Sequence, residues 1–255
     1  MYIYIYDSYV NQKKYDKILA HIETRITDLS LNGKIVRVGI MTSVNDVVDT
    51  EVKRGINTII AVGNNYIFNQ VLNAIGRLLE YNKNLTLGFI PVGRENNEIA
   101  DLLGIDLEEG ACDALSARRL NTLDLGRVNN SFFLTQAEIN TEATKIEVDE
   151  NFSIETDREG TVYILNLPLL NFITDKQASD PEDGKLELFI TNKKNNKIII
   201  PSNEYGRSYF DFNNLNIISK KHKIKLDNSL LIETPASVKI AKEKINLIVG
   251  RSRKF

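Results

Sequence analysis

The chain has 255 residues, which is enough for one or two domains with apolar cores of their own. Its 32 Lys and Arg residues nearly balance its 34 Asp and Glu residues, so the formal net charge is -2. This balance excludes a strongly basic nucleic-acid binder, and we expect no nucleic-acid partner. The single cysteine, Cys112, cannot form an internal disulfide, and two histidines are too few for the usual structural zinc sites.

The first apolar run of the chain ends at Asp7, which is too short for a secretory signal peptide. No stretch approaches the roughly 18 apolar residues that a membrane-spanning helix needs. We therefore expect a cytoplasmic protein, with attachment to a membrane surface as an alternative. The basic runs 220–223 and 251–254 could make such a peripheral contact, although solvated charges are the simpler interpretation.

The first half of the chain alternates strand and helix patterns. Runs rich in β-branched and aromatic residues predict strands at 2–6, 35–40, 58–62 and 85–90. Between them, apolar residues at helical spacing predict helices over 15–29, 47–52 and 67–79. This alternation with short links predicts a doubly wound parallel sheet with helices on both faces.

The second half, from about Thr122, contains successive strand patterns separated by turn signals such as Asp183-Gly184. We expect strands at 132–134, 145–154, 161–165, 186–191, 198–200, 215–218, 224–226, 237–240 and 245–249. This spacing predicts an antiparallel β-sandwich. The predicted domains are therefore 1–122 (α/β) and 123–255 (all-β), with the alternative that the C-terminal end packs back on the first domain. A cleft between domains is the expected ligand site.

Two strand-to-helix turns carry the best candidates for a binding site. The strand at 58–62 runs into Gly63-Asn64-Asn65, and the N–H groups of a following helix would favour an anion there. A plain turn with an Asn helix cap is the alternative. The strand at 85–90 runs into 91–97, where Arg94 could bind phosphate or could pair with Glu95.

These turns resemble the two nucleotide loops of the diacylglycerol kinase catalytic-domain family, which shares its fold with NAD kinases. Residues 62–75, VGNNYIFNQVLNAI, are similar to the family's V-G-G-D-G-T-(L/I)-N-E-V-(L/V)-N-G-(L/I). Residues 91–105 are similar to P-x-G-T-x-N-x-x-A-x-x-L-G-I, with one residue more. Further similar segments follow in the family's order at 123–129, 133–137, 178–188 and 224–229.

The resemblance implies an ATP-dependent lipid kinase, a magnesium-using transferase of phospholipid metabolism. It implies a nucleotide-binding-like first domain, a lipid-binding-like second domain, and a lipid or nucleotide between them. It also implies a homodimer or a paralogous kinase as partner. The matching nucleotide-site positions are Gly63, Asn64, Asn65, Tyr66, Gly93, Arg94, Asn96 and Asn97.

The resemblance further implies a structural Mg²⁺ at the acidic turn that begins at Asp180. Bacterial members hold this ion at the matching position. Asp183 would supply a carboxylate, and Asp180 and Lys185 would supply mostly backbone oxygens, which are ligands that suit a hard cation. A plain acidic hairpin turn is the alternative interpretation.

The chain departs from the family at the positions that carry the chemistry. Asn65 replaces the Asp that helps to organise Mg²⁺ and phosphate, and Tyr66 replaces a Gly of the phosphate loop. Ser229 stands where the family has its general base, a Glu, and a serine hydroxyl cannot do that work. Asp227, two residues away, is a possible surrogate. Other possible proton acceptors are Glu204, Glu233 and His222.

These losses predict a catalytically impaired pseudokinase that acts as a binding or interaction module. The first alternative is a divergent ATP-dependent lipid kinase that phosphorylates a lipid hydroxyl, with Arg94, Asn65 and Asn97 at the phosphates and Asp227 as base. A second alternative is a sensor that binds a nucleotide or a phospholipid without turnover.

Overall fold

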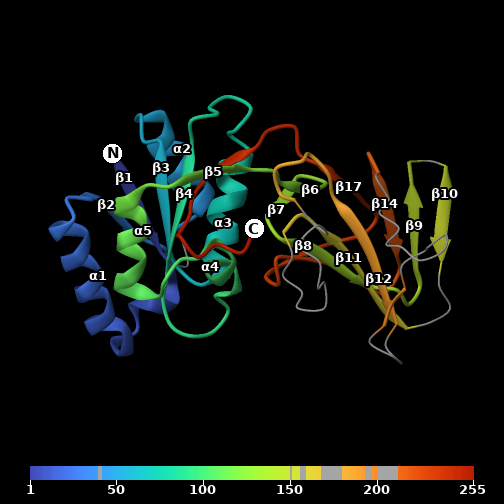
Figure 1. The fold of residues 1–255 in the computed structure, drawn as a ribbon, viewed down its shortest axis with the longest axis horizontal. Helices are drawn as coiled ribbons and strands as arrows, with labels where there is room; N and C mark the ends of the chain where they lie inside the picture. The colour runs from blue at the N-terminus through green and yellow to red at the C-terminus, as the bar shows by residue number, and fades with distance from the viewer. Residues whose placement is uncertain (40–41, 150, 156–158, 168–179, 193–196, 200–211) are drawn as a thin grey trace. The chain divides into compact units, whose positions relative to one another are not determined.

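The computed structural model describes residues 1–39, 42–149, 151–155, 159–167, 180–192, 197–199 and 212–255. The chain forms two compact units (Figure 1). Unit 1 contains residues 1–123 and 243–255, and unit 2 contains residues 124–242. The last thirteen residues therefore belong to the unit in which the chain began.

Unit 1 is built on a six-stranded sheet in the order β2-β1-β3-β4-β18-β5. The strands are β1 (Tyr2–Tyr6), β2 (Gly33–Arg37), β3 (Thr58–Gly63), β4 (Thr86–Pro91), β5 (Leu120–Leu123) and β18 (Ile245–Ile248). All neighbouring pairs are parallel except β18 and β5, which are antiparallel. The predicted parallel sheet is confirmed. The expected strand at 245–249 forms as β18. It extends the sheet of unit 1 rather than the sandwich, as in the alternative in which the C-terminal end packs back on the first domain.

The helices of unit 1 cover both faces of this sheet, with α1 and α5 on one face and α2 and α3 on the other (Figure 1). They are α1 (Asp16–Asp28), α2 (Val44–Lys53), α3 (Asn65–Gly76), α4 (Glu98–Leu103) and α5 (Ala111–Ala117), with short 3₁₀ helices η1 (Ser8–Asn11), η2 (Lys13–Tyr15) and η3 (Glu108–Gly110). In α1 the buried residues Leu19, Ile22 and Ile26 recur at helical spacing and form one apolar face.

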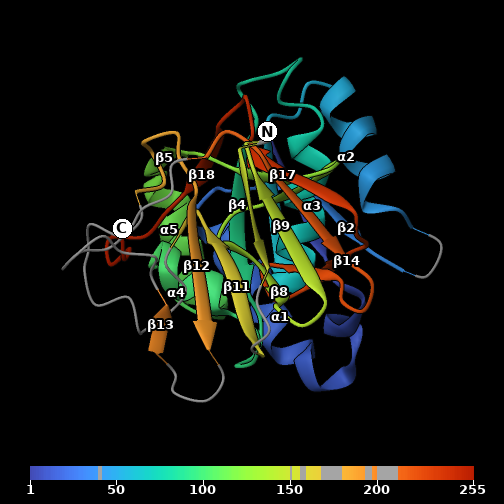
Figure 2. The ribbon, with the colours of Figure 1, turned by 90° about the vertical axis from the view of Figure 1, so that its right-hand side faces the viewer.

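Unit 2 is a sandwich of two six-stranded antiparallel sheets (Figure 2). One sheet has the order β10-β9-β14-β17-β6-β7 and the other β13-β12-β11-β8-β15-β16. Their bounds are β6 (Gly126–Val128), β7 (Ser131–Phe133), β8 (Gln136–Asn140), β9 (Thr144–Val148), β10 (Phe152–Glu155), β11 (Gly160–Leu165), β12 (Glu187–Asn192), β13 (Lys197–Ile199), β14 (Leu215–Ser219), β15 (Ile224–Leu226), β16 (Leu230–Ile232) and β17 (Ala236–Ile240).

Alternate side chains of both sheets form a single core in unit 2. Ala137 and Ile139 of β8 meet residues such as Ile146 and Val148 of β9 in one buried cluster. This alternation is typical of a sandwich, the architecture that the sequence predicted. The predicted continuous strand 145–154 is wrong, because Asp149 adopts a φ of +48° and turns the chain into the β9–β10 hairpin.

Candidate functional site

The first amides of α3 are satisfied by the chain itself. Asn64 caps the helix, and its side-chain oxygen accepts a 3.0 Å hydrogen bond from the Tyr66 N–H. The Asn65 N–H donates to the Asn96 carbonyl at 2.8 Å, and the Phe68 N–H donates to the Asn64 carbonyl at 3.2 Å. The cap interpretation of this turn is therefore confirmed. Helix N-termini bind anions through amides that lack such partners.

Side chains from two segments, residues 7–9 and α3, crowd Gly63, the glycine of the first loop. Gly63 has a φ of +152°, and a Cβ placed on it would lie 2.8 Å from the Ile67 Cγ2 and 3.0 Å from the Asp7 Cβ. The ring of Tyr9 is next, at 3.4 Å. The Tyr9 hydroxyl donates a 2.6 Å hydrogen bond to the carbonyl of Val92, which ties the segment after β1 to the end of β4. Burial raises the pKa of Tyr9, so this phenol stays protonated and keeps donating.

The sequence interpretation did not single out Asp7 or Tyr9. The sequence did contain a signal for Asp7. This residue directly follows β1, and the carboxyl ends of parallel strands meet at one edge of the sheet. Tyr9 carries no comparable local signal. Its position depends on Val92, which lies 83 residues further along the chain.

The bulky replacements in the first loop have different positions. Ile67 is 1% exposed and lies against Gly63, whereas the side chain of Tyr66 is turned outward and Tyr66 is 49% exposed. Asn65 is 3% exposed, and its amide nitrogen donates a 2.6 Å hydrogen bond to the Glu98 Oε2. The amide of Asn65 thus joins the first loop to the start of α4.

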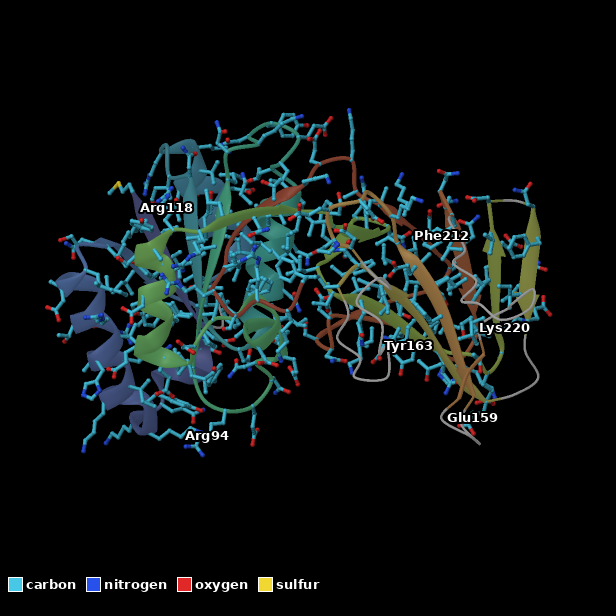
Figure 3. The ribbon with its side chains drawn as sticks, in the orientation of Figure 1. Arg94, Arg118, Glu159, Tyr163, Phe212 and Lys220 are labelled. Carbon is cyan, nitrogen blue, oxygen red and sulfur yellow. The ribbon has the colours of Figure 1, made fainter. Side chains whose placement is uncertain are left out.

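The second loop is held by its own backbone and by Asn97. Gly93 and Asn96 adopt φ values of +83° and +56°, and the Asn97 amide nitrogen donates to the Gly93 carbonyl at 2.7 Å. Arg94 lies at the outer edge of unit 1 (Figure 3). Within the described residues its guanidinium makes no hydrogen bond or ion pair. The expected pair between Arg94 and Glu95 is therefore not formed.

A groove of about 400 Å³ lies beside this loop, within unit 1. It runs between the second loop, α4 and the segment that follows α4. Its lining residues are Arg94, Asn96, Asn97, Glu98, Ala100, Asp101, Ile105, Asp106 and Leu107. Three of the predicted nucleotide-site residues, Arg94, Asn96 and Asn97, thus line one groove.

Asp227 is a buried carboxylate with several donors. It is 1% exposed, and it accepts hydrogen bonds from the N–H groups of Leu134, Thr135 and Gln136 at 2.8–3.0 Å and from the Thr135 hydroxyl at 2.5 Å. Burial raises the pKa of Asp227, and these hydrogen bonds oppose that shift. The side chain thereby fixes the chain between β7 and β8.

Ser229 lies in the turn between β15 and β16, and its N–H donates to the Leu226 carbonyl at 2.9 Å. The other possible proton acceptors have surface partners. Glu233 pairs with Lys223, and His222 lies 3.7 Å from a Glu142 oxygen. Glu204 lies outside the described residues. The surrogate-base interpretation of Asp227 stays a prediction.

The acidic turn of unit 2 is ordered by its own carboxylates. The Asp180 Oδ1 accepts the Glu182 N–H at 2.9 Å, and the Asp183 Oδ1 accepts the Lys185 N–H at 2.9 Å. No group of three or more His, Cys, Asp or Glu side chains that could hold a metal ion occurs in the described part of the chain. The predicted Mg²⁺ site relies on backbone oxygens and one carboxylate, so it stays a prediction.

A parallel α/β unit with an antiparallel sandwich inserted before its last strand is the fold of the diacylglycerol kinases. A diacylglycerol kinase structure from Bacillus anthracis str. Sterne matches with a TM-score of 0.75 and 16% identity, over 98% of this chain and 97% of that one. A second structure from the same organism matches with a TM-score of 0.74 and 17% identity, over 99% and 98%.

Residues 2–128 match the family model of the diacylglycerol kinase catalytic domain, and the chain belongs to this family. A comparison with curated proteins finds no match. None of the helices among the described residues is long and apolar enough to cross a membrane.

Proposed function

We propose that this diacylglycerol kinase-like chain has lost lipid kinase activity and acts as a binding or interaction module. The observation that carries the proposal is the crowding of Gly63 by Ile67, Asp7 and Tyr9. In the family the glycines of this loop give phosphates access to the backbone, and access of this kind requires that side chains be absent. Here the space on the Cβ side of the glycine is filled by side chains of α3 and of residues 7–9.

Two further features support the proposal. Asn65 supplies no negative charge for Mg²⁺, and its amide nitrogen is already engaged by Glu98. At the base position, Ser229 has no useful proton affinity near neutral pH. Asp227 already accepts hydrogen bonds from three backbone amides and a hydroxyl, so a substrate proton would compete with donors of the fold.

One observation favours the alternative, a divergent ATP-dependent lipid kinase. Arg94 lines the groove of the second loop and its guanidinium has no partner among the described residues, so it could contact a phosphate. In that case Asp227 would be the surrogate base and Asp183 would help to hold a structural Mg²⁺.

The test is thermal unfolding with and without Mg²⁺-ATP or Mg²⁺-ADP, followed by a kinase assay on vesicles that contain diacylglycerol. A nucleotide at 100 times its Kd would stabilise the protein by about 2.7 kcal/mol. We expect no shift and no phosphate transfer, with an active bacterial diacylglycerol kinase as positive control. A clear shift together with transfer would overturn the proposal in favour of the divergent kinase.

An interaction module needs a macromolecular partner, and we propose a second copy of the chain or an intact paralogous kinase. Light scattering of the purified protein tests whether two copies of the chain associate. Co-purification with a paralogous kinase, followed by an activity assay of that kinase, tests the other partner. A strictly monomeric protein that does not alter the paralogue's activity would remove both partners.

A further inference from the structure

The groove beside the second loop contains uncompensated charges of both signs. Arg94 and Asp106 line it, and neither makes a hydrogen bond or an ion pair with another described residue. Asp101 also lines the groove, but it is paired with Lys254 from the C-terminal segment. Glu98 receives the neutral amide of Asn65 at 2.6 Å, which orients the carboxylate without balancing its charge.

The balance of these charges indicates the kind of ligand that the groove would accept. Three carboxylates, Glu98, Asp101 and Asp106, stand against two cations, Arg94 and Lys254, so the formal charge around the groove is about -1. A nucleoside triphosphate, with several negative charges, would be repelled by Glu98 and Asp106, the two carboxylates that no cation balances. A ligand that carries one anionic group and one ammonium group would match both signs.

An unsatisfied acceptor in the lining also favours a ligand that carries an ammonium group. The side-chain oxygen of Asn97 is buried and has no hydrogen-bond partner, while its nitrogen is fixed on the Gly93 carbonyl at 2.7 Å. A buried acceptor without a donor is costly, and an ammonium group that reached the Asn97 oxygen would supply one.

We propose that this groove binds a small zwitterion, with its anionic group on Arg94 and its ammonium group on Glu98 and Asp106. The volume of about 400 Å³ is in the range of small-molecule sites and suits a compact ligand. The shared chemistry is that of a phosphoethanolamine group, either free or as a lipid headgroup. The proposal rests on the proposed function, because it gives a groove of the former nucleotide loop a different ligand.

The first experiment is titration calorimetry with three probes. O-phosphoethanolamine carries both charged groups, glycerol 3-phosphate only the anion, and ethanolamine only the cation. We expect O-phosphoethanolamine to bind about tenfold or more tightly than either single-charge probe, since each charged group adds a charge-assisted hydrogen bond. Flotation with phosphatidylethanolamine vesicles against pure phosphatidylcholine vesicles distinguishes the lipid source from the free compound.

Matched variants connect this binding to the groove. Arg94→Gln and Asp106→Asn each remove one charge, and each should weaken binding of O-phosphoethanolamine about tenfold. Arg118→Gln removes a guanidinium elsewhere on unit 1 (Figure 3), and Asp28→Asn removes an exposed carboxylate of α1, so both should retain the wild-type affinity. Urea unfolding of all four variants verifies that they are folded.

Two kinds of result would overturn the proposal. One is the absence of any binding of free O-phosphoethanolamine and of phosphatidylethanolamine vesicles. The other is binding of a single-charge probe as tightly as O-phosphoethanolamine, together with no effect of Arg94→Gln or of Asp106→Asn on binding. Mg²⁺-ATP is titrated separately. Its binding followed by phosphate transfer would contradict the proposed function, whereas failure of Mg²⁺-ATP to bind, together with failure of the zwitterion, would contradict only this inference.

Discussion

The main-chain N–H of Asn65 donates a 2.8 Å hydrogen bond to the carbonyl oxygen of Asn96. This bond joins the first residue of α3 to the turn before α4, and the side chains repeat the connection through Asn65 and Glu98 at 2.6 Å. The two loops that the family uses for a nucleotide are therefore bonded to each other here. A phosphate that needed the Asn65 amide would have to displace the Asn96 carbonyl.

The first prediction concerns the charge at Asn65. Asn65→Asp would place a carboxylate against the Glu98 Oε2, where a donor now lies, at a position that is 3% exposed. We expect a loss of about 2 kcal/mol in the free energy of unfolding at pH 7, because a carboxylate buried at position 65 would lie beside a second carboxylate, that of Glu98. Urea denaturation measures this loss of stability.

The adjacent variant Asn64→Asp is the control. Asn64 caps α3 through its side-chain oxygen, and Asp caps helices as well as Asn does. We expect a change within about 0.5 kcal/mol for this variant. Equal losses in both variants would show that the Asn65–Glu98 contact has no special role.

The second prediction tests whether Asp227 is structural. Asp227→Asn keeps the shape of the side chain but points an amide NH₂ group at backbone N–H donors. We expect a loss of about 3 kcal/mol in urea denaturation, since breaking a buried network around a charge is strongly destabilising. Glu233→Gln, on the surface of the same hairpin, should cost less than about 1 kcal/mol. A fully stable Asp227→Asn protein would contradict the structural role.

The sequence predicted most of the fold because the relevant signals are local. Apolar residues at helical spacing and short β-rich runs determine where helices and strands form. They do not determine the sheet that a strand joins. The pattern at 245–249 reads as a strand, but its pairing with β4 and β5 depends on residues more than 120 positions away.

The candidate site was less predictable, because it depends on backbone angles and distant partners. The sequence places Asp227 two residues before Ser229 but does not give the backbone angles between them. In the structure Asp227 and Asn228 have φ values of +44° and +57°, so these residues form a turn. The pairing of Arg94 with Glu95 was likewise undecidable, since neighbouring charges pair only when the backbone lets their side chains meet.

The third prediction is a pH dependence at Glu51. This residue is 5% exposed, and it accepts hydrogen bonds from Lys34 and Arg54 at 2.7 Å each. The hydrogen bond from Lys34 is the main cause of a lowered pKa for Glu51. A lowered native-state pKa stabilises the fold above the ordinary value of 4.5, and this contribution is lost as the pH falls through the native-state pKa.

We therefore expect Glu51→Gln to be about 1 kcal/mol less stable than the wild type at pH 7, since both cations are partly exposed. The difference should shrink as the pH falls below about 4.5. Glu80→Gln, at an exposed position, is the matched control. Thermal unfolding between pH 3 and pH 7 measures both variants. A constant difference across that range would exclude the ion pairs as its cause.

The last prediction compares two glycines with similar backbone angles. Gly104 and Gly184 have φ values of +65° and +78°, so alanine is strained at either position by about 1 kcal/mol. A Cβ on Gly184 would meet no atom within 4 Å, whereas one on Gly104 would lie 2.3 Å from the Arg253 backbone nitrogen. The C-terminal segment is fixed there by hydrogen bonds from Gly250 to Leu103 and from Lys254 to Leu102.

Backbone atoms cannot rotate away as a side-chain tip can, so Gly104→Ala must displace the C-terminal segment. We expect it to lose about 3 kcal/mol or more, against about 1 kcal/mol for Gly184→Ala. Hydrogen exchange should also speed up at the Gly250 and Lys254 amides in Gly104→Ala alone, because their acceptors lie on α4. Equal losses in the two variants, with unchanged exchange at these amides, would mean that φ strain alone accounts for both losses of stability. The close approach of Arg253 to Gly104 would then not fix the C-terminal segment on α4.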